Sequence, residues 1–231
     1  MRRWRQWALP LTALACVAAL LFSLPTVKRA DATYRVAQTV TILIDPGHGG
    51  ADGGASGSGG VQEKDVNLAV SRTLAALLLV MGFPVSMTRE DDRSIHSPQV
   101  SSLREQKVSD MHNRLALYER AGLVLSIHQN QFTQSQYSGA QVFYAPQNPQ
   151  SQPLAAAIRE QVLALLQPEN TRELKRADKS LYLMANATVP VALVECGFLS
   201  NPAECRRLAD PDYQRQMAFA ITAGVLCYLA P

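Results

Sequence analysis

Four residues with side chains that bind metals or move protons stand at the ends of apolar segments or beside glycines. His48 follows the segment TILIDPG, His128 follows LVLSI, Glu195 follows PVALV, and Glu63 closes a glycine-rich stretch. Imidazole and carboxylate side chains can bind a metal ion or act as general acids and bases. The gaps between positions 48, 63, 128 and 195 match no short metal motif such as HExxH, so spacing alone does not select a metal.

Each of these residues also has an ordinary structural interpretation. A single histidine at a strand end is commonly a turn residue, and a glutamate after a strand is commonly a cap or an ion-pair partner. Glu63 at the start of a helix would be stabilised by the helix dipole. The functional interpretation therefore depends on whether the fold brings the four side chains to one place.

The elements that position these residues alternate between strand-like and helix-like patterns. Such alternation predicts an α/β fold: a single domain with a largely parallel or mixed central sheet of about six strands and helices on both faces. The predicted strands cover residues 40–44, 83–88, 123–127, 140–144 and 189–194; the predicted helices cover 65–81, 104–118 and 151–165 and begin again at 202 and 211. In open sheets of this class, ligands bind at the carboxyl ends of the strands, so all four residues are expected at one edge.

The N-terminal region differs from the rest of the chain. Residues 1–30 combine an arginine-rich start with the uncharged 19-residue run from Trp7 to Pro25, a pattern typical of an export signal or membrane anchor. Cleavage and retention of this segment both remain open. Residues 31–38 are interpreted as a linker and 39–231 as the catalytic domain, exported to the outer side of the membrane or to the wall.

Charge and cysteine content narrow the function further. Five of the 22 Lys and Arg residues lie before residue 31, which leaves 17 basic against 19 acidic groups in the remainder. No basic stripe is available for phosphates, so nucleic acid is not an expected partner. Cys196, Cys205 and Cys227 form no CxxC motif, and a Cys196–Cys205 disulfide is an open alternative.

Six sequence blocks carry a specific resemblance. In order along residues 39–230 they are DPGHGGADGG, EKDVNLAV, MTRE, SIHQN, SGAQVFY and VPVALVECGFLSN. They resemble the successive motifs of the zinc-dependent N-acetylmuramoyl-L-alanine amidases, the bacterial cell-wall hydrolases. The spacing, the leader and the lack of a wall-binding repeat are most similar to the sporulation amidases that help to make muramic lactam in spore cortex.

The resemblance implies a site and a reaction. His48, Glu63 and His128 match the Zn²⁺ ligands and Glu195 matches the catalytic carboxylate. The bond cut would join the lactyl group of N-acetylmuramic acid to L-alanine, with the peptidoglycan glycan strand and stem peptide as partners. The N-terminal segment implies membrane contact, and an activator protein is a possible further partner.

Neighbouring residues receive less specific roles. Asp45 is a candidate to hold His48 or its loop and Asn130 to brace the turn after His128, against ordinary turn chemistry for both. Arg114 matches a family arginine, although an exposed helix face is the simpler interpretation. Gln129 and Gln131 depart from the small or apolar residues usual in the family.

The glycines after His48 are expected to keep the loop slim beside the metal, while Asp52 is interpreted only as a turn residue. Some amidases of the family carry a helical insertion that plugs the zinc site. Here QFTQSQYSGA alone separates Asn130 from the next predicted strand, so an open site is expected. Two alternatives stand beside the amidase: another zinc hydrolase of the wall, such as a carboxypeptidase or deacetylase, and a wall-binding module without catalysis.

Overall fold

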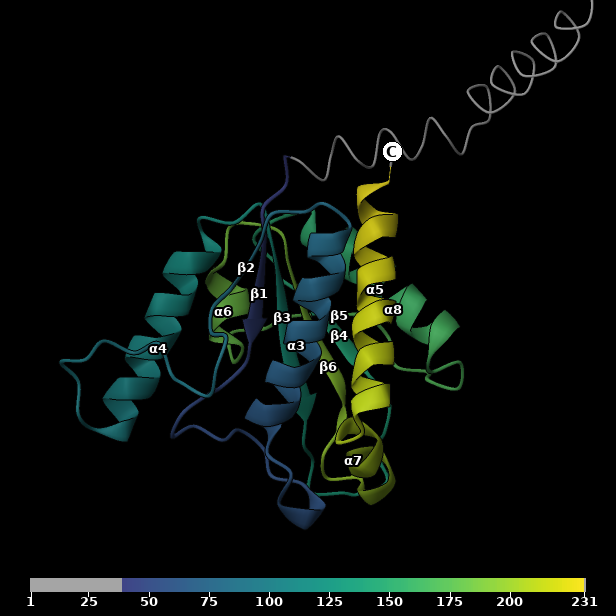
Figure 1. Ribbon diagram of the computed structural model, residues 1–231, viewed down its shortest axis with the longest axis horizontal. Helices are drawn as coiled ribbons and strands as arrows, with labels where there is room; N and C mark the ends of the chain where they lie inside the picture. Colours follow the sequence, from purple (N-terminus) through teal and green to yellow (C-terminus); the bar gives the residue numbers. More distant parts are fainter. Residues whose placement is uncertain (1–38, 231) are drawn as a thin grey trace, which may run out of the picture.

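The computed structural model describes residues 39–230 (Figure 1). The predicted leader at 1–30 and linker at 31–38 lie outside the described residues. Among the helices of the described part, none has the length and apolar character needed to cross a bilayer.

A six-stranded mixed sheet forms the centre of the domain, as the alternating pattern predicts. Its spatial order is β2-β1-β3-β6-β4-β5, in which β2, β1, β3 and β6 run parallel and β4 runs antiparallel to β6. The strands are β1 (Ile42–Pro46), β2 (Val85–Met87), β3 (Leu123–Asn130), β4 (Gln141–Tyr144), β5 (Lys175–Arg176) and β6 (Val191–Phe198).

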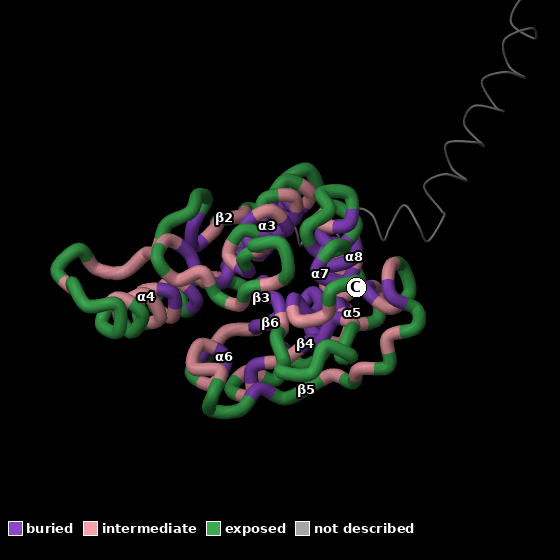
Figure 2. The backbone as a smooth tube through the Cα atoms, turned by 90° about the horizontal axis from the view of Figure 1, so that it is seen from below, coloured by how far each residue is buried: buried purple, intermediate pink, exposed green. Residues whose placement is uncertain are grey.

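Helices cover both faces of this sheet. In Figure 2, α3, α5, α7 and α8 lie on one side of the strands, and α4 and α6 lie on the other. The helices are α3 (Glu63–Val80), α4 (Leu103–Tyr118), α5 (Ser151–Leu165), α6 (Tyr182–Asn186), α7 (Pro202–Leu208) and α8 (Pro211–Leu229), with a short 3-10 turn, η1 (Ser58–Gly60).

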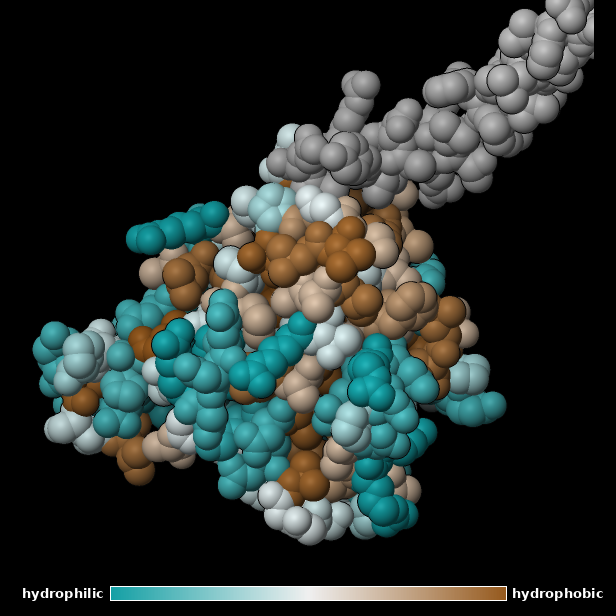
Figure 3. Space-filling view, in the orientation of Figure 1, coloured by the Kyte–Doolittle hydropathy of each residue, from teal (hydrophilic) through white to brown (hydrophobic). Residues whose placement is uncertain are grey.

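Two hydrophobic clusters follow from side-chain alternation along the buried strands. Leu125 and Ile127 of β3 pack with α3, α5 and α8, whereas Val124 of β3 packs with Leu193 of β6, Tyr118 of α4 and Met184 of α6. The helical face in Figure 3 is more apolar in its upper part and more hydrophilic below, toward the carboxyl ends of the parallel strands.

The structure differs from the predicted elements in three ways. β1 and β6 extend past their predicted ends, to Pro46 and Phe198, and therefore carry the sheet up to the candidate site. β5 and α6 were not predicted, because two and five residues are too few to show a periodicity. The candidate disulfide is absent, since Cys196 and Cys205 are both free and buried.

Helix α4 is attached to the sheet by buried polar groups in addition to the apolar packing of Leu115 and Leu117. Its buried residues are Arg114 and Tyr118, while Val108 is 42% exposed. The exposed-face interpretation of Arg114 is therefore wrong. The guanidinium forms an ion pair with the fully buried Asp45 and donates to the carbonyls of Pro46 and His48 at 2.9 and 2.7 Å.

Asp45 is the centre of this buried network. Its carboxylate accepts hydrogen bonds from the hydroxyls of Thr88, Tyr118 and Ser126 in addition to Arg114. Burial by itself raises the pKa of Asp45, but Arg114 and the hydroxyls of Thr88 and Tyr118 outweigh it, so that the pKa lies below its ordinary value.

Asp45→Asn is expected to lower the free energy of unfolding by about 3 kcal/mol at pH 7, because it removes one of the two carboxylates that pair with the buried Arg114 and leaves only Asp110. Urea unfolding measures this loss. The control is Asp91→Asn, which removes an exposed ion pair with Arg93 and should change stability by less than about 1 kcal/mol. Equal losses in the two variants would contradict the central role of Asp45.

The same pair predicts an acid dependence of stability. Because the pKa of Asp45 is lowered by folding, the folded state binds fewer protons, and this stabilisation is complete above the unfolded pKa of about 4. It is lost as pH falls through the folded pKa. The decrease in unfolding free energy from pH 7 to 3 should therefore be smaller in Asp45→Asn than in the unsubstituted protein.

Candidate functional site

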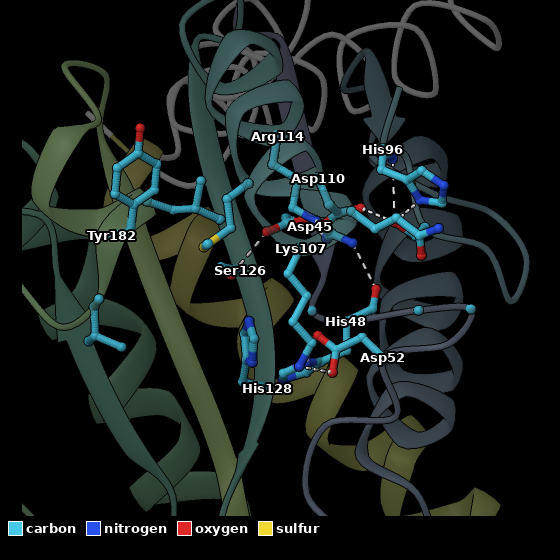
Figure 4. Close-up of a pocket in the computed structure, with 18 of the residues that line it drawn as sticks. Asp45, His48, Asp52, His96, Lys107, Asp110, Arg114, Ser126, His128 and Tyr182 are labelled. Carbon is cyan, nitrogen blue, oxygen red and sulfur yellow. Dashed lines mark hydrogen bonds and ion pairs between the residues drawn. The ribbon is translucent and has the colours of Figure 1, made fainter. Parts of the chain in front are cut away.

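His48, Glu63 and His128 converge at the carboxyl edge of the sheet, although 80 residues separate the two histidines in the chain. Their ligand-type atoms all lie within 4.8 Å of one another. Glu63 Oε1 is 3.2 Å from His48 Nε2 and 2.9 Å from His128 Nδ1. Figure 4 shows both imidazoles at the base of a cleft.

The tip of β1 presents His48 in an unusual backbone conformation. His48 is the one residue other than glycine within 39–230 with a positive φ, at 62°. Its Nδ1 lies 3.0 Å from Asp52 Oδ2, which leaves Nε2 directed at Glu63. Lys107 of α4 in turn contacts the other oxygen of Asp52 at 2.9 Å. The turn-only interpretation of Asp52 is therefore wrong, because its carboxylate orients the imidazole.

Two carboxylates surround the His48 imidazole and favour its charged form. Burial lowers the pKa of His48, but the hydrogen bonds and charges of Asp52 and Glu63 reverse this and raise it to about 9. The site therefore attracts positive charge. A divalent cation would bind there in competition with the proton on the ring.

The imidazole of His128 stacks directly on the backbone of Gly47. A Cβ atom at position 47 would lie 2.1 Å from His128 Cε1, well inside any permitted contact. The two imidazoles meet edge to face, with ring centroids 5.1 Å apart. Gly47 is therefore required for the approach of the β1 tip to the end of β3.

Glu63 is the first residue of α3, and its carboxylate is held from several directions. Oε2 accepts from the backbone N–H of Ala55 at 2.8 Å, and Oε1 accepts from the N–H of Gln129 at 3.1 Å and from Asn67 Nδ2 at 3.3 Å. Burial raises the pKa of Glu63, yet hydrogen bonds to His128 and His48 lower it far below its ordinary value. The carboxylate is thus ionised and fixed toward the imidazoles.

Gln129, which departs from the family pattern, takes part in this support. Its buried side chain donates from Nε2 to Asn67 Oδ1 at 3.1 Å, and Asn67 also donates to the carbonyl of Gly47 at 3.2 Å. One buried amide network thus joins β3, α3 and the tip of β1. Sequence alone gave no signal for it beyond the unusual residue type.

Glu195 lies directly opposite His128 in the pairing of β3 with β6. Its Oε2 atom is buried and has no hydrogen-bond partner among residues 39–230. Burial is the main cause that raises the pKa of Glu195 to about 7, with Glu63 adding to the rise and His128 and His48 opposing it. A carboxyl group in this state is suited to take up and return a proton near neutral pH.

Arg89 is a supporting residue that sequence analysis missed. Although it is almost fully buried, its guanidinium donates to the carbonyls of Pro46, Gly47 and Lys64 at 2.8–3.1 Å. The available signal was a charged residue directly after the strand predicted at 83–88. Asp45 holds the His48 loop through Arg114. The carbonyl of Asn130 accepts from Leu199 N–H at 2.9 Å and continues the pairing of β3 with β6, and the bracing role of its side chain stays a prediction.

A cleft of about 560 Å³ opens beside the two imidazoles, between α4 with its preceding loop and α6. Lys107 and His96 line one wall and Tyr182 lines the other (Figure 4). Glu195 is also part of the lining. No residue of the segment 131–140 lines the cleft. The expectation that this short segment leaves the site unplugged agrees with that arrangement.

Two histidines and two glutamates at the edge of an α/β sheet define a hydrolytic enzyme with a ligand set for a metal ion. Residues 42–227 match the family model described as N-acetylmuramoyl-L-alanine amidase. The chain belongs to this family and is an amidase that cleaves the bond between the lactyl group of N-acetylmuramic acid and L-alanine in peptidoglycan.

Individual relatives agree with this assignment. The germination-specific N-acetylmuramoyl-L-alanine amidase of Bacillus subtilis (strain 168) is 40% identical over 189 residues, which make up 81% of this chain and 78% of the relative. The CwlD amidase of Clostridioides difficile, solved in complex with the GerS lipoprotein, superimposes with a TM-score of 0.79 at 39% identity, covering 82% of this chain and 98% of that one. The amidase AmiC2 of Nostoc punctiforme superimposes with a TM-score of 0.67 at 32% sequence identity, and the match covers 82% of this chain and 97% of that one.

Gly47→Ala is expected to lower kcat/KM for peptidoglycan about 100-fold, because the added methyl group must displace the His128 ring by roughly 1 Å. Release of new L-alanine amino termini measures the rate. Gly53→Ala is the control, since its Cβ would meet only the Gln62 side chain, at 3.4 Å. A Gly47→Ala enzyme as active as Gly53→Ala would show that this contact does not set the geometry.

Proposed function

We propose that this amidase is zinc-dependent and that His48, Glu63 and His128 are its metal ligands. The observation that carries the proposal is the convergence of His48 Nε2, His128 Nδ1 and Glu63 Oε1 within 4.8 Å, beside the unpartnered Oε2 of Glu195. Two nitrogen donors and one carboxylate suit Zn²⁺ and leave a position for water or substrate. The anionic surroundings of His48 also favour a cation.

The ion would supply one part of the chemistry. When bound, zinc polarises the scissile carbonyl and lowers the pKa of a coordinated water to about 7. The side chains of the protein position the ligands. Asp52 orients the ring of His48, and the Asn67–Gln129 network holds the carboxylate of Glu63. Arg89 and Arg114 hold the backbone carbonyls of Gly47 and His48.

Glu195 is proposed as the general base and then the general acid. Its free Oε2 would accept a proton from the attacking water, and the protonated carboxyl would return it to the departing amine of L-alanine. The pKa of about 7 suits both steps, because neither protonation state is strongly disfavoured. The cleft beside Glu195 would hold the part of the substrate that bears the scissile amide.

We also propose an extracytoplasmic role in spore cortex, with the N-terminal segment as export signal or anchor. Support comes from the germination-specific relative and from the CwlD structure, whose GerS partner also suggests a lipoprotein activator for this chain. Muropeptide mass spectrometry of a deletion strain tests the role: cortex should lack muramic lactam. Unchanged cortex would contradict it without affecting the amidase assignment.

Two substitutions distinguish the proton-transfer role of Glu195 from the metal-binding role of His48. Glu195→Ala is expected to keep its zinc but to lose at least 100-fold in kcat, whereas His48→Ala should lose both zinc and cleavage. Metal content by plasma emission spectrometry and release of L-alanine amino termini measure the two properties. Cleavage retained in Glu195→Ala would exclude it as the proton-transfer residue.

The amide network predicts an effect on metal affinity. Gln129→Met keeps the volume but removes the hydrogen bond to Asn67, so zinc binding should weaken about tenfold, at the lower end of such supporting contacts. Competition with a chromogenic chelator measures affinity. Gln131→Met is the control, since Gln131 is exposed and contacts only the carbonyl of Ser56. Equal affinities in the two variants would remove Gln129 from the metal site.

A further inference from the structure

A bulge in β6 turns an aromatic side chain toward the face of the sheet that carries the site. His128 pairs with Glu195, and the next pair is Asn130 with Phe198, so β6 uses three residues where β3 uses two. Residues opposite each other in a pair share a face, so Phe198 lies on the same face as His128 and Glu195. Without the bulge, alternation would direct it toward α3.

Phe198 is the buried base of an aromatic cluster beside the metal site. The ring of Phe132 is 5.2 Å from that of Phe198 and 5.1 Å from that of Tyr137, both in edge-to-face contact. The Arg172 guanidinium lies 4.4 Å above the Phe198 ring and 5.7 Å from the Tyr137 ring. We call Phe132, Tyr137, Phe198 and Arg172 the aromatic platform.

Two rings of the platform are exposed to solvent although the core could have buried them. Phe132 is 45% and Tyr137 38% exposed, whereas Phe198 is fully buried beneath them. The other exposed phenylalanine within 39–230, Phe219 at 57%, stands on α8 on the opposite side of the sheet and has no aromatic neighbour there. Adjoining exposed aromatic rings are typical of a binding surface.

The segment that bears these rings is held in place by hydrogen bonds. The N–H of Phe132 donates to Ser200 Oγ, Asn201 Nδ2 donates to the carbonyl of Tyr137, and Arg172 Nε donates to the carbonyl of Ser138. The surface is therefore formed before any ligand arrives, which lowers the entropy cost of binding.

A buried carboxylate completes this anchoring. Glu204 lies three residues after the Asn201 cap of α7, and its side chain, 1% exposed, accepts from Gly139 N–H at 2.9 Å and Phe198 N–H at 2.7 Å. Asn201 alone caps the helix. Glu204 thus ties the end of the aromatic segment to the bulge in β6.

We propose that the aromatic platform binds a pyranose ring of the glycan strand, next to the muramic acid whose amide is cleaved; this inference rests on the amidase function. Aromatic faces contact the C–H groups of a sugar ring, and a tyrosine hydroxyl adds a polar contact. The terminal nitrogens of Arg172 have no partner within 39–230 and are free to donate to sugar hydroxyl or acetamido oxygens. No platform residue lines the cleft between α4 and α6, so glycan and cleft occupant do not compete.

Binding of peptide-free glycan strands to zinc-loaded Glu195→Ala protein tests the platform without cleavage. Adding Phe132→Ala and Tyr137→Ala should weaken binding about tenfold. Phe219→Ala, an equivalent loss of an exposed ring on the other face, should leave affinity unchanged. The conservative pair Phe132→Tyr and Tyr137→Phe keeps both ring faces and should bind within about twofold of the parent.

Three outcomes would overturn the proposal. The first is equal glycan affinity in the double alanine variant and Phe219→Ala. The second is a loss confined to strands that carry stem peptide, which would make the peptide the occupant. The third is loss of binding in the conservative pair at unchanged melting temperature. Because no cleavage is measured, failure of the zinc mechanism would leave this result intact.

Discussion

The site depends on a buried ion pair between Asp45 on β1 and Arg114 on α4. Desolvation makes such a pair a weak source of net stability, but removal of Arg114 leaves the buried Asp45 charge unpaired, and removal of Asp45 leaves Arg114 with Asp110 alone. The pair therefore specifies a geometry more than it adds free energy. Arg114, held by Asp45, fixes the carbonyls of Pro46 and His48, and this fixes the backbone that presents the imidazole. It also helps to attach α4, whose other buried residue, Tyr118, contacts the same carboxylate and packs in the apolar cluster on that face of the sheet.

A second buried arginine reinforces the same turn. Arg89 shares the carbonyl of Pro46 with Arg114 and adds that of Gly47, so two guanidinium groups satisfy a loop that has left the sheet. The positive φ of His48 is sustained by this surrounding structure. Positive and negative side chains therefore occupy different parts of the site. The guanidinium groups contact the backbone, whereas the carboxylates of Asp52 and Glu63 face the imidazoles and create a negative potential that attracts a cation.

Sequence was sufficient for the architecture and the four central residues, because each follows from a local rule. Buried strands produce continuous apolar runs, and His48, His128 and Glu195 were found where such runs end. Glu63 was found where the glycine-rich stretch ends, although an acidic first helical residue is common. The supporting residues could not be predicted because their partners are distant: Arg89 contacts the β1 tip 42 residues away and Gln129 contacts Asn67 62 residues away. Asp52 is only four residues from His48, but its role depends on a turn whose shape Arg114 sets from α4.

The bulge in β6 links the catalytic carboxylate to the surface beyond it. In a regular strand, Glu195 and Gly197 would face the site and Phe198 would face α3. One additional residue between the paired positions brings Phe198, three residues after Glu195 along the chain, to the site face. Gly197 is required there because a Cβ atom would lie 2.7 Å from Glu204 Cδ, the carboxylate that fixes the bulge. The local break in register thus sets the spacing between the proposed proton-transfer group and the Phe198 base of the proposed glycan platform.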